Sequence, residues 1–313
     1  MIKEEFYFDS RDGENRIHAV RYTPDDGNVR GIVQIVHGMA EYVERYENLA
    51  EFLTKRGILV TGEDHLGHGK SVSEGGSFGY FCEQDPATVV VRDVHRLKKI
   101  TEEQYPQVPY IILGHSMGSF IVRNYLCRYG SGIDGAVIVG TGMQSSGLIF
   151  ASKAMAGIQK LFCGSKHVSH FIDKAAFGGY NKRIDSPRTS SDWLSRNTDN
   201  VDRYIADELC GFTFTVNGFQ TLFELIRRLQ KQENLEKVPQ NLPILMVSGA
   251  EDPVGDYGKG VHKACGSLKR AGVKNIIVKL YENDRHELLN EDDAETAMED
   301  IWQWICKEVP GIA

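Results

Sequence analysis

The chain has 313 residues, of which 41% are hydrophobic and 25% are charged, and its formal net charge at pH 7 is -7. This balance is typical of a globular protein with a well-buried core, and it argues against a broad nucleic-acid-binding surface, which needs a basic stripe. No stretch approaches the roughly 18 consecutive apolar residues of a membrane span, and the first ten residues lack the apolar core of a signal peptide.

The first 140 residues alternate between short apolar segments and amphipathic segments. Residues 4–10 and 16–23 alternate apolar and polar side chains on either side of a turn, which predicts a pair of antiparallel strands. Short buried strands separated by amphipathic helices are then expected at 31–38, 58–64, 110–116 and 135–141. This order predicts an α/β fold with a mostly parallel central sheet flanked by helices.

The alternation stops near residue 142 and resumes near residue 240. The intervening segment contains helical pieces but no clear buried strand, and it carries 13 lysines and arginines against 10 acidic residues. A helical insertion between two parallel strands most simply covers the carboxyl ends of the strands, where such sheets bind ligands. We therefore predict a core of residues 1–141 and 240–313, and a helical cap of residues 142–239 inserted after the sixth strand.

Two serines, Ser77 and Ser116, lie in a G-x-S-x-G motif. Ser116 follows an apolar strand and precedes an apolar helix, which is the context of a nucleophile elbow, whereas Ser77 lies among glycines and serines typical of a loop. Gly114 and Gly118 are expected to let this strand and helix approach closely. Ser116 is therefore the predicted nucleophile.

A serine nucleophile needs a histidine base and a carboxylate that orients the base. On an α/β-hydrolase scaffold these follow in the order serine, acid, histidine, each after a strand. Asp252 follows the apolar segment 243–249, and His286 follows the segment 275–281, so we expect both at the edge of the sheet that carries Ser116. Three nearby carboxylates are rivals for the acid role: Glu251, Asp256 and Asp284.

The reaction also needs backbone donors for an oxyanion. One is the N–H of Met117, directly after the nucleophile, and the other is expected in the loop after the third strand, at the N–H of Met39. Gly38 is expected to let the backbone turn in this loop. His37 and His115 lie beside these motifs, where we expect them to hold loops by hydrogen bonds.

Nearly the whole chain resembles the monoacylglycerol lipase and lysophospholipase group of α/β-hydrolases, which is also classed with serine aminopeptidase-like hydrolases. Five segments carry the resemblance: HGMAEYVERYENLAEFLTKRG, GEDHLGHGKS, LGHSMGS, SGAEDPVG and YENDRHELLNE. The resemblance implies a catalytic triad of Ser116, Asp252 and His286, an oxyanion hole at Met39 and Met117, and a helical cap over the site.

The expected function is that of a serine hydrolase that cleaves carboxylic esters, such as monoacylglycerols or lysophospholipid-like lipids, through an acyl-enzyme. A short-chain, aryl or cinnamoyl esterase, an amidase or aminopeptidase, and a non-catalytic binding protein are the alternatives. Apolar cap residues could line an acyl pocket or form the cap's own core, and the candidates for substrate contact are Phe150, Met155, Phe212 and Phe214. The cap's positive charge would suit transient membrane contact, and a solvated face explains it equally well.

Neither a cofactor nor a metal is expected. No Rossmann or P-loop glycine motif follows a strand, and hydrolysis by a triad needs only water. The acidic and histidine residues of GEDHLGHGKS are interpreted as a structural loop. The six cysteines are scattered without a C-x-x-C pair, so we expect reduced thiols in a cytoplasmic protein. The oligomeric state is left open.

Overall fold

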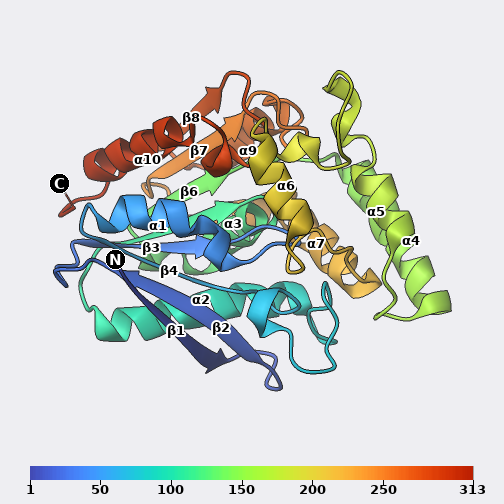
Figure 1. Cartoon of the computed structure of the whole chain (residues 1–313), viewed down its shortest axis with the longest axis horizontal. Coiled ribbons are helices and arrows are strands. Elements are labelled where there is room, and N and C mark those ends of the chain that lie inside the picture. The colour runs from blue at the N-terminus through green and yellow to red at the C-terminus, as the bar shows by residue number, and fades with distance from the viewer. Residues whose placement is uncertain (313) are drawn as a thin grey trace.

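The computed structural model describes residues 1–312 and contains an eight-stranded sheet with helices on both faces (Figure 1). The strand order is β1-β2-β4-β3-β5-β6-β7-β8, in which the β1–β2 and β2–β4 pairs are antiparallel and the others parallel. The predicted α/β architecture is confirmed. The strands are β1 (Ile2–Asp9), β2 (Arg16–Thr23), β3 (Gly31–Val36), β4 (Ile58–Glu63), β5 (Tyr110–His115), β6 (Gly135–Val139), β7 (Ile244–Gly249) and β8 (Ile276–Tyr281).

Helices cover both faces of the central strands, so β3 to β7 are buried along their whole length. Successive side chains of a strand point to opposite faces, and accordingly Ile111 and Leu113 pack with α1 and α10, whereas Ile112 packs with α2, α3 and α9. The bounds of these helices are α1 (Glu47–Thr54), α2 (Pro86–Gln104), α3 (Met117–Tyr129), α9 (Lys259–Arg270) and α10 (Ala294–Glu308).

The segment between β6 and β7 contributes five helices. Four of them begin at a polar residue whose side chain accepts a hydrogen bond from a first-turn N–H, which explains where the chain turns helical. Figure 1 shows α4 and α5 at the edge of the molecule, with α6 and α7 nearer the sheet. The helices are α4 (Ser146–Cys163), α5 (His170–Phe177), α6 (Thr198–Ala206), α7 (Val216–Leu229) and α8 (Gln232–Leu235).

This capping segment does not have a core of its own. Phe214, Phe219 and Phe223 belong to the same buried cluster as Phe120 and Phe81 of the body. The helix α7 packs against α3 through this shared cluster. Because α7 is part of the main core, it forms a fixed wall beneath the more exposed helices α4 and α5.

Candidate active site

Ser116 occupies a sharp turn between β5 and α3. Its backbone angles are φ 54° and ψ -119°, a strained conformation for a residue with a side chain. The turn is held by the Ser116 N–H, which donates to the Val139 carbonyl at 3.0 Å. A Cβ on Gly118 would lie 1.9 Å from the Val36 carbonyl oxygen, and one on Gly114 would lie 2.5 Å from the Gly118 carbonyl oxygen. Glycine at these two positions therefore lets α3 pass close to the strands.

His286 and Asp252 are hydrogen-bonded to each other below the cap. The Nδ1 atom of His286 lies 3.0 Å from Oδ2 of Asp252, and both side chains are almost completely buried. The other carboxylate oxygen accepts the Val254 N–H at 2.8 Å, and the Ser248 hydroxyl donates to Oδ2 at 3.2 Å. These bonds fix the carboxylate, which can in turn hold the imidazole in one orientation and tautomer.

The three rival carboxylates lie in other environments. Glu251 and Asp256 are exposed to solvent. Asp284 is buried and accepts a hydrogen bond from Arg196 at 2.6 Å. Burial, reinforced by nearby acidic groups, raises the pKa of Asp284 to about 6. Of the four candidate acids, Asp252 is the one hydrogen-bonded to His286.

Ser116 and His286 line the same cavity. The hydrogen bonds among residues 1–312 do not include one between the Ser116 hydroxyl and the His286 ring. Such a bond is often long in a ligand-free hydrolase and shortens when substrate binds. The fold therefore brings Ser116 and His286 to the same cavity without a direct hydrogen bond between them.

The expected oxyanion donors lie on the same cavity. Met117 is the first residue of α3, where an N–H has no partner within the helix, and Met39 belongs to the loop after β3. Gly38 does not adopt the left-handed conformation that a glycine turn would suggest. A Cβ at Gly38 would instead lie 2.5 Å from the Glu41 carboxylate and 3.1 Å from Cβ of Ser116. Close approach, not backbone turning, explains this glycine.

A buried polar network lies behind the site and includes His115, which joins two loops by hydrogen bonds as expected. The Glu41 carboxylate accepts bonds from the Gly38 N–H at 2.5 Å and the Tyr46 hydroxyl at 2.8 Å, and it lies 3.1 Å from Nδ1 of His115. Burial opposes the ionisation of Glu41, but His115 and Arg45 hold its pKa below the ordinary value. The Nε2 atom of His115 lies 3.1 Å from the carbonyl oxygen of the candidate base.

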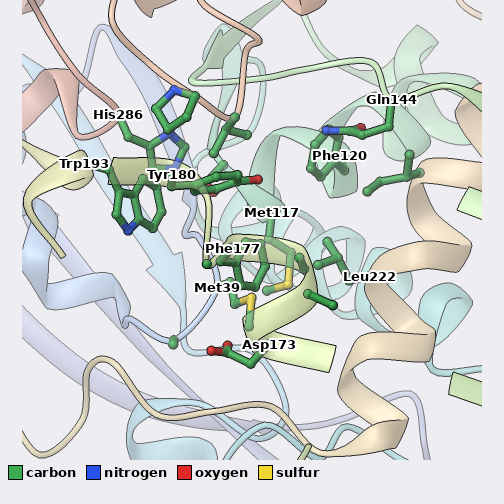
Figure 2. Close-up of a pocket in the computed structure, with 18 of the residues that line it drawn as sticks. Met39, Met117, Phe120, Gln144, Asp173, Phe177, Tyr180, Trp193, Leu222 and His286 are labelled. Carbon is green, nitrogen blue, oxygen red and sulfur yellow. The ribbon is translucent and has the colours of Figure 1, made fainter. Parts of the chain in front are cut away.

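The cavity has a volume of about 900 Å³ and is lined mostly by apolar side chains (Figure 2). Met155 and Phe212, two of the expected substrate contacts, line it. The other two expectations are wrong. Phe150 is 77% exposed on the outer surface of α4, and Phe214 is fully buried against Phe81 in the main core. Helical spacing alone does not say which face of a cap helix meets the cavity.

Several residues that line the cavity could not be predicted to do so from the sequence. Trp193 packs over the candidate base, with 5.1 Å between the ring centroids, and Tyr180 contacts Trp193 edge-on at 4.9 Å. Both come from short turns of the cap that have no periodic pattern. Asp173 of α5 also lines the cavity, and Figure 2 shows it at the opposite side from His286.

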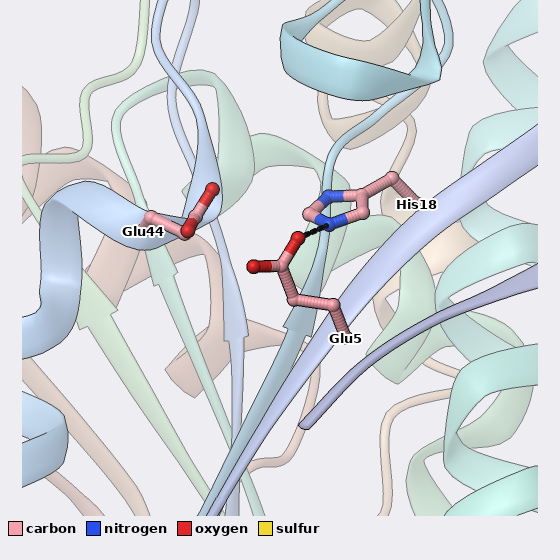
Figure 3. Close-up of side chains that lie close together, drawn as sticks. All are labelled: Glu5, His18 and Glu44. Carbon is pink, nitrogen blue, oxygen red and sulfur yellow. Dashed lines mark hydrogen bonds and ion pairs between the residues drawn. The ribbon is translucent and has the colours of Figure 1, made fainter. Parts of the chain in front are cut away.

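A second cluster of ionisable groups lies at the edge of the sheet, where Glu5, His18 and Glu44 place three potential ligand atoms within 4.8 Å of one another (Figure 3). Two lysines neutralise it. Lys70 contacts Glu5 at 2.7 Å and Glu44 at 3.0 Å, and Lys3 bonds Glu44. The cluster is an ion-pair network that joins β1 and β2 to the segment after β3.

The chain is similar to known proteins both in sequence and in structure. A family model described as serine aminopeptidase, S33, matches residues 27–293. The chain is 27% identical to the monoglyceride lipase of Rattus norvegicus over 293 residues, or 92% of this chain and 86% of that protein. It is also 27% identical to the monoacylglycerol lipase of Mycolicibacterium smegmatis, covering 91% and 90% of the two chains. A thermostable carboxyl esterase from Bacillus coagulans, solved in complex with glycerol, superimposes with a TM-score of 0.91 at 31% identity over the full length of both chains.

Proposed function

The chain belongs to the serine aminopeptidase S33 family and has the α/β-hydrolase fold, and from this premise we propose that it is a serine esterase that cleaves monoacylglycerols or similar lipid esters. One observation carries the proposal: a strained serine lines an apolar cavity of about 900 Å³ together with a histidine that is hydrogen-bonded to a buried aspartate. The names of the relatives, which include monoacylglycerol lipases and a carboxyl esterase, support the same substrate class.

In the proposed mechanism, the Ser116 hydroxyl attacks the ester carbonyl carbon while His286 takes its proton. Asp252, bonded to Nδ1, keeps Nε2 free to act as the base and stabilises the imidazolium that forms. The N–H groups of Met39 and Met117 donate to the oxyanion. The imidazolium then protonates the departing alcohol, and a water molecule activated by the same histidine releases the fatty acid from the acyl-enzyme.

The lining of the cavity suits an acyl chain. Side chains of α3, α4 and α7 contribute Phe120, Met155, Leu222 and Phe223 to its wall, and burial of each methylene of a substrate there would contribute about 0.8 kcal/mol. A long chain therefore has more to gain from this cavity than an acetyl group has. This favours a lipid esterase over the short-chain alternative.

The name of the family raises aminopeptidase activity as a second possibility. An aminopeptidase must hold the substrate's ammonium group next to the scissile carbonyl, and a cap carboxylate is the group suited to do so. Asp173 is the cap carboxylate that lines the cavity, and Figure 2 shows it on the opposite side from His286. This separation favours ester substrates over aminoacyl amides.

We also propose that the protein makes transient contact with a lipid surface. Large apolar side chains are exposed on the outer face of α4 and α5, where Figure 1 shows these helices at the edge of the molecule. None of the helices within residues 1–312 is long and apolar enough to cross a membrane. Transient docking of this face, which we call the outer cap patch, would deliver a lipid from a membrane to a cytoplasmic enzyme. The patch comprises Phe150, Ile158, Leu161, Phe162 and Phe171.

The test is a substrate profile. Hydrolysis rates of p-nitrophenyl esters with two to sixteen acyl carbons, measured beside monooleoylglycerol and an aminoacyl p-nitroanilide, should peak at long chains and include glycerol release. Ser116→Ala should abolish turnover and labelling by a fluorophosphonate without changing the melting temperature. A maximum at two to four carbons with no monoglyceride cleavage would refute the lipid substrate, and turnover by the alanine variant would refute the nucleophile.

A further inference from the structure

The loop after β3 that carries Met39 has a conformation that needs external support. Ala40 has a φ of 53°, in the left-handed region that side-chain-bearing residues avoid. Strained conformations of this kind persist only where surrounding contacts hold them. The contacts of this loop therefore decide how the Met39 N–H is presented to the cavity.

The body of the protein holds one end of the loop. Glu41 accepts the Gly38 N–H at 2.5 Å, and Arg45 in turn donates to Glu41 at 3.0 Å. Arg45 also donates to both oxygens of Glu287, the residue after the candidate base, at 2.6 and 2.8 Å. One guanidinium thus joins the loop after β3 to the loop after β8.

The cap holds the other end of the loop. The carbonyl oxygen of Ala40 accepts two hydrogen bonds, one from the Tyr204 hydroxyl at 3.2 Å and one from the Gly211 N–H at 3.0 Å. Tyr204 belongs to α6, which Figure 1 shows between the sheet and the outer helices α4 and α5. Its ring lies under the guanidinium of Arg45 at 4.9 Å, which fixes the direction of the hydroxyl. Burial raises the pKa of Tyr204, so this hydroxyl remains a donor at neutral pH.

We propose that Tyr204 is a positioning residue for the oxyanion hole: its hydrogen bond to the Ala40 carbonyl lets the docked cap hold the Met39 N–H in the geometry that the transition state needs. The peptide that carries this N–H lies between two pinned groups, the Gly38 N–H and the Ala40 carbonyl. Loss of the Tyr204 bond leaves the Ala40 carbonyl held by the Gly211 N–H alone, so the left-handed turn can relax in part. Catalytic competence is thereby coupled to the position of α6, and the inference rests on the proposed esterase function.

Tyr204→Phe is the sharpest test, because it removes one hydroxyl and keeps the ring that packs under Arg45. Tyr42→Phe is the matched control. Tyr42 also bonds the cap, through Asp207 at 2.8 Å, but this bond does not touch the Ala40 carbonyl. Both variants and the wild type would be compared on p-nitrophenyl butyrate and in binding a trifluoromethyl ketone, which forms an oxyanion with the serine.

For Tyr204→Phe we expect kcat to fall by about fivefold, the scale of one neutral hydrogen bond. The affinity for the ketone should fall by the same factor, while KM and the melting temperature stay close to those of the wild type. Tyr42→Phe should remain within twofold of the wild type in every measurement. The inference would be overturned if Tyr204→Phe kept the wild-type kcat, if both variants lost kcat equally, or if only KM changed. A wild type without ester turnover would instead refute the proposed function, and this inference with it.

Discussion

Gly118→Ala should displace the nucleophile by a distance that can be read from the structure. The new Cβ would lie 1.9 Å from the Val36 carbonyl oxygen and 2.6 Å from the His37 carbonyl oxygen, whereas an ordinary contact begins at 3.4 Å. The Val36 oxygen belongs to the last residue of β3, which is paired with β4 and β5, and the His37 oxygen belongs to the next residue, so this backbone resists displacement. The start of α3 must therefore move by about 1.5 Å, taking Ser116 and the Met117 N–H with it.

A displacement of about 1 Å in a catalytic group can cost about 100-fold in rate. We therefore expect kcat/KM on a p-nitrophenyl ester to fall by about 100-fold or more, and fluorophosphonate labelling to slow in parallel. Overpacking should also lower the melting temperature, since such insertions cost about 1–3 kcal/mol.

Gly157→Ala is the matched control for this experiment, because a Cβ there meets nothing within 4 Å and the residue lies inside α4. Alanine should stabilise that helix slightly and leave turnover unchanged. A Gly118→Ala variant with the wild-type melting temperature and a kcat/KM within threefold of wild type would refute the close-approach argument.

Three further experiments test other parts of the molecule. Asp252→Asn should lower kcat by about 10⁴-fold, as the same change does in another serine hydrolase, while steady-state kinetics of exposed Glu251→Gln should match the wild type. Burial raises the pKa of Glu63 to about 8, so the folded state keeps a proton that the unfolded state loses, and stability should fall as pH rises from about 4.5 to 8. Glu63→Gln should remove that loss, raising the melting temperature at pH 8 but not at pH 4.5; an equal shift at both pH values would contradict this. Replacing Leu161 and Phe162, each 84% exposed, by serine should weaken co-sedimentation with lipid vesicles by about tenfold and spare p-nitrophenyl acetate hydrolysis; unchanged vesicle binding would exclude the outer cap patch.

The positions of the candidate catalytic residues could be predicted from the sequence because they depend on short local patterns of apolar residues. Apolar segments that alternate with helices specify a parallel sheet, and the carboxyl ends of parallel strands meet at one edge. Ser116, Asp252 and His286 each lie within about five residues of the end of such a strand, so their approach to one another needs no knowledge of side-chain packing. The sequence does not separate Asp252 from the three carboxylates near it, because the exposure and hydrogen-bond partners of each depend on how the turns fold.

Which cap side chains face the cavity could not be predicted in the same way. A helix in the cap has apolar residues on several sides, and only docking decides which side meets the cavity. Phe150 and Met155 lie on the same helix, yet one faces solvent and the other the cavity. Phe214, which precedes α7, is part of the main core, because it packs against Phe81 and Phe219.

The fold class, the strand-to-helix turn at Ser116 and the order in which the polar residues reach the edge of the sheet could all be predicted from the sequence, because they follow from short periodic patterns and from glycines at close approaches. The ion pair between Arg45 and Glu287 and the two cap bonds to the Ala40 carbonyl could not be predicted in this way. These contacts join segments more than a hundred residues apart, and they form only when the whole chain has folded.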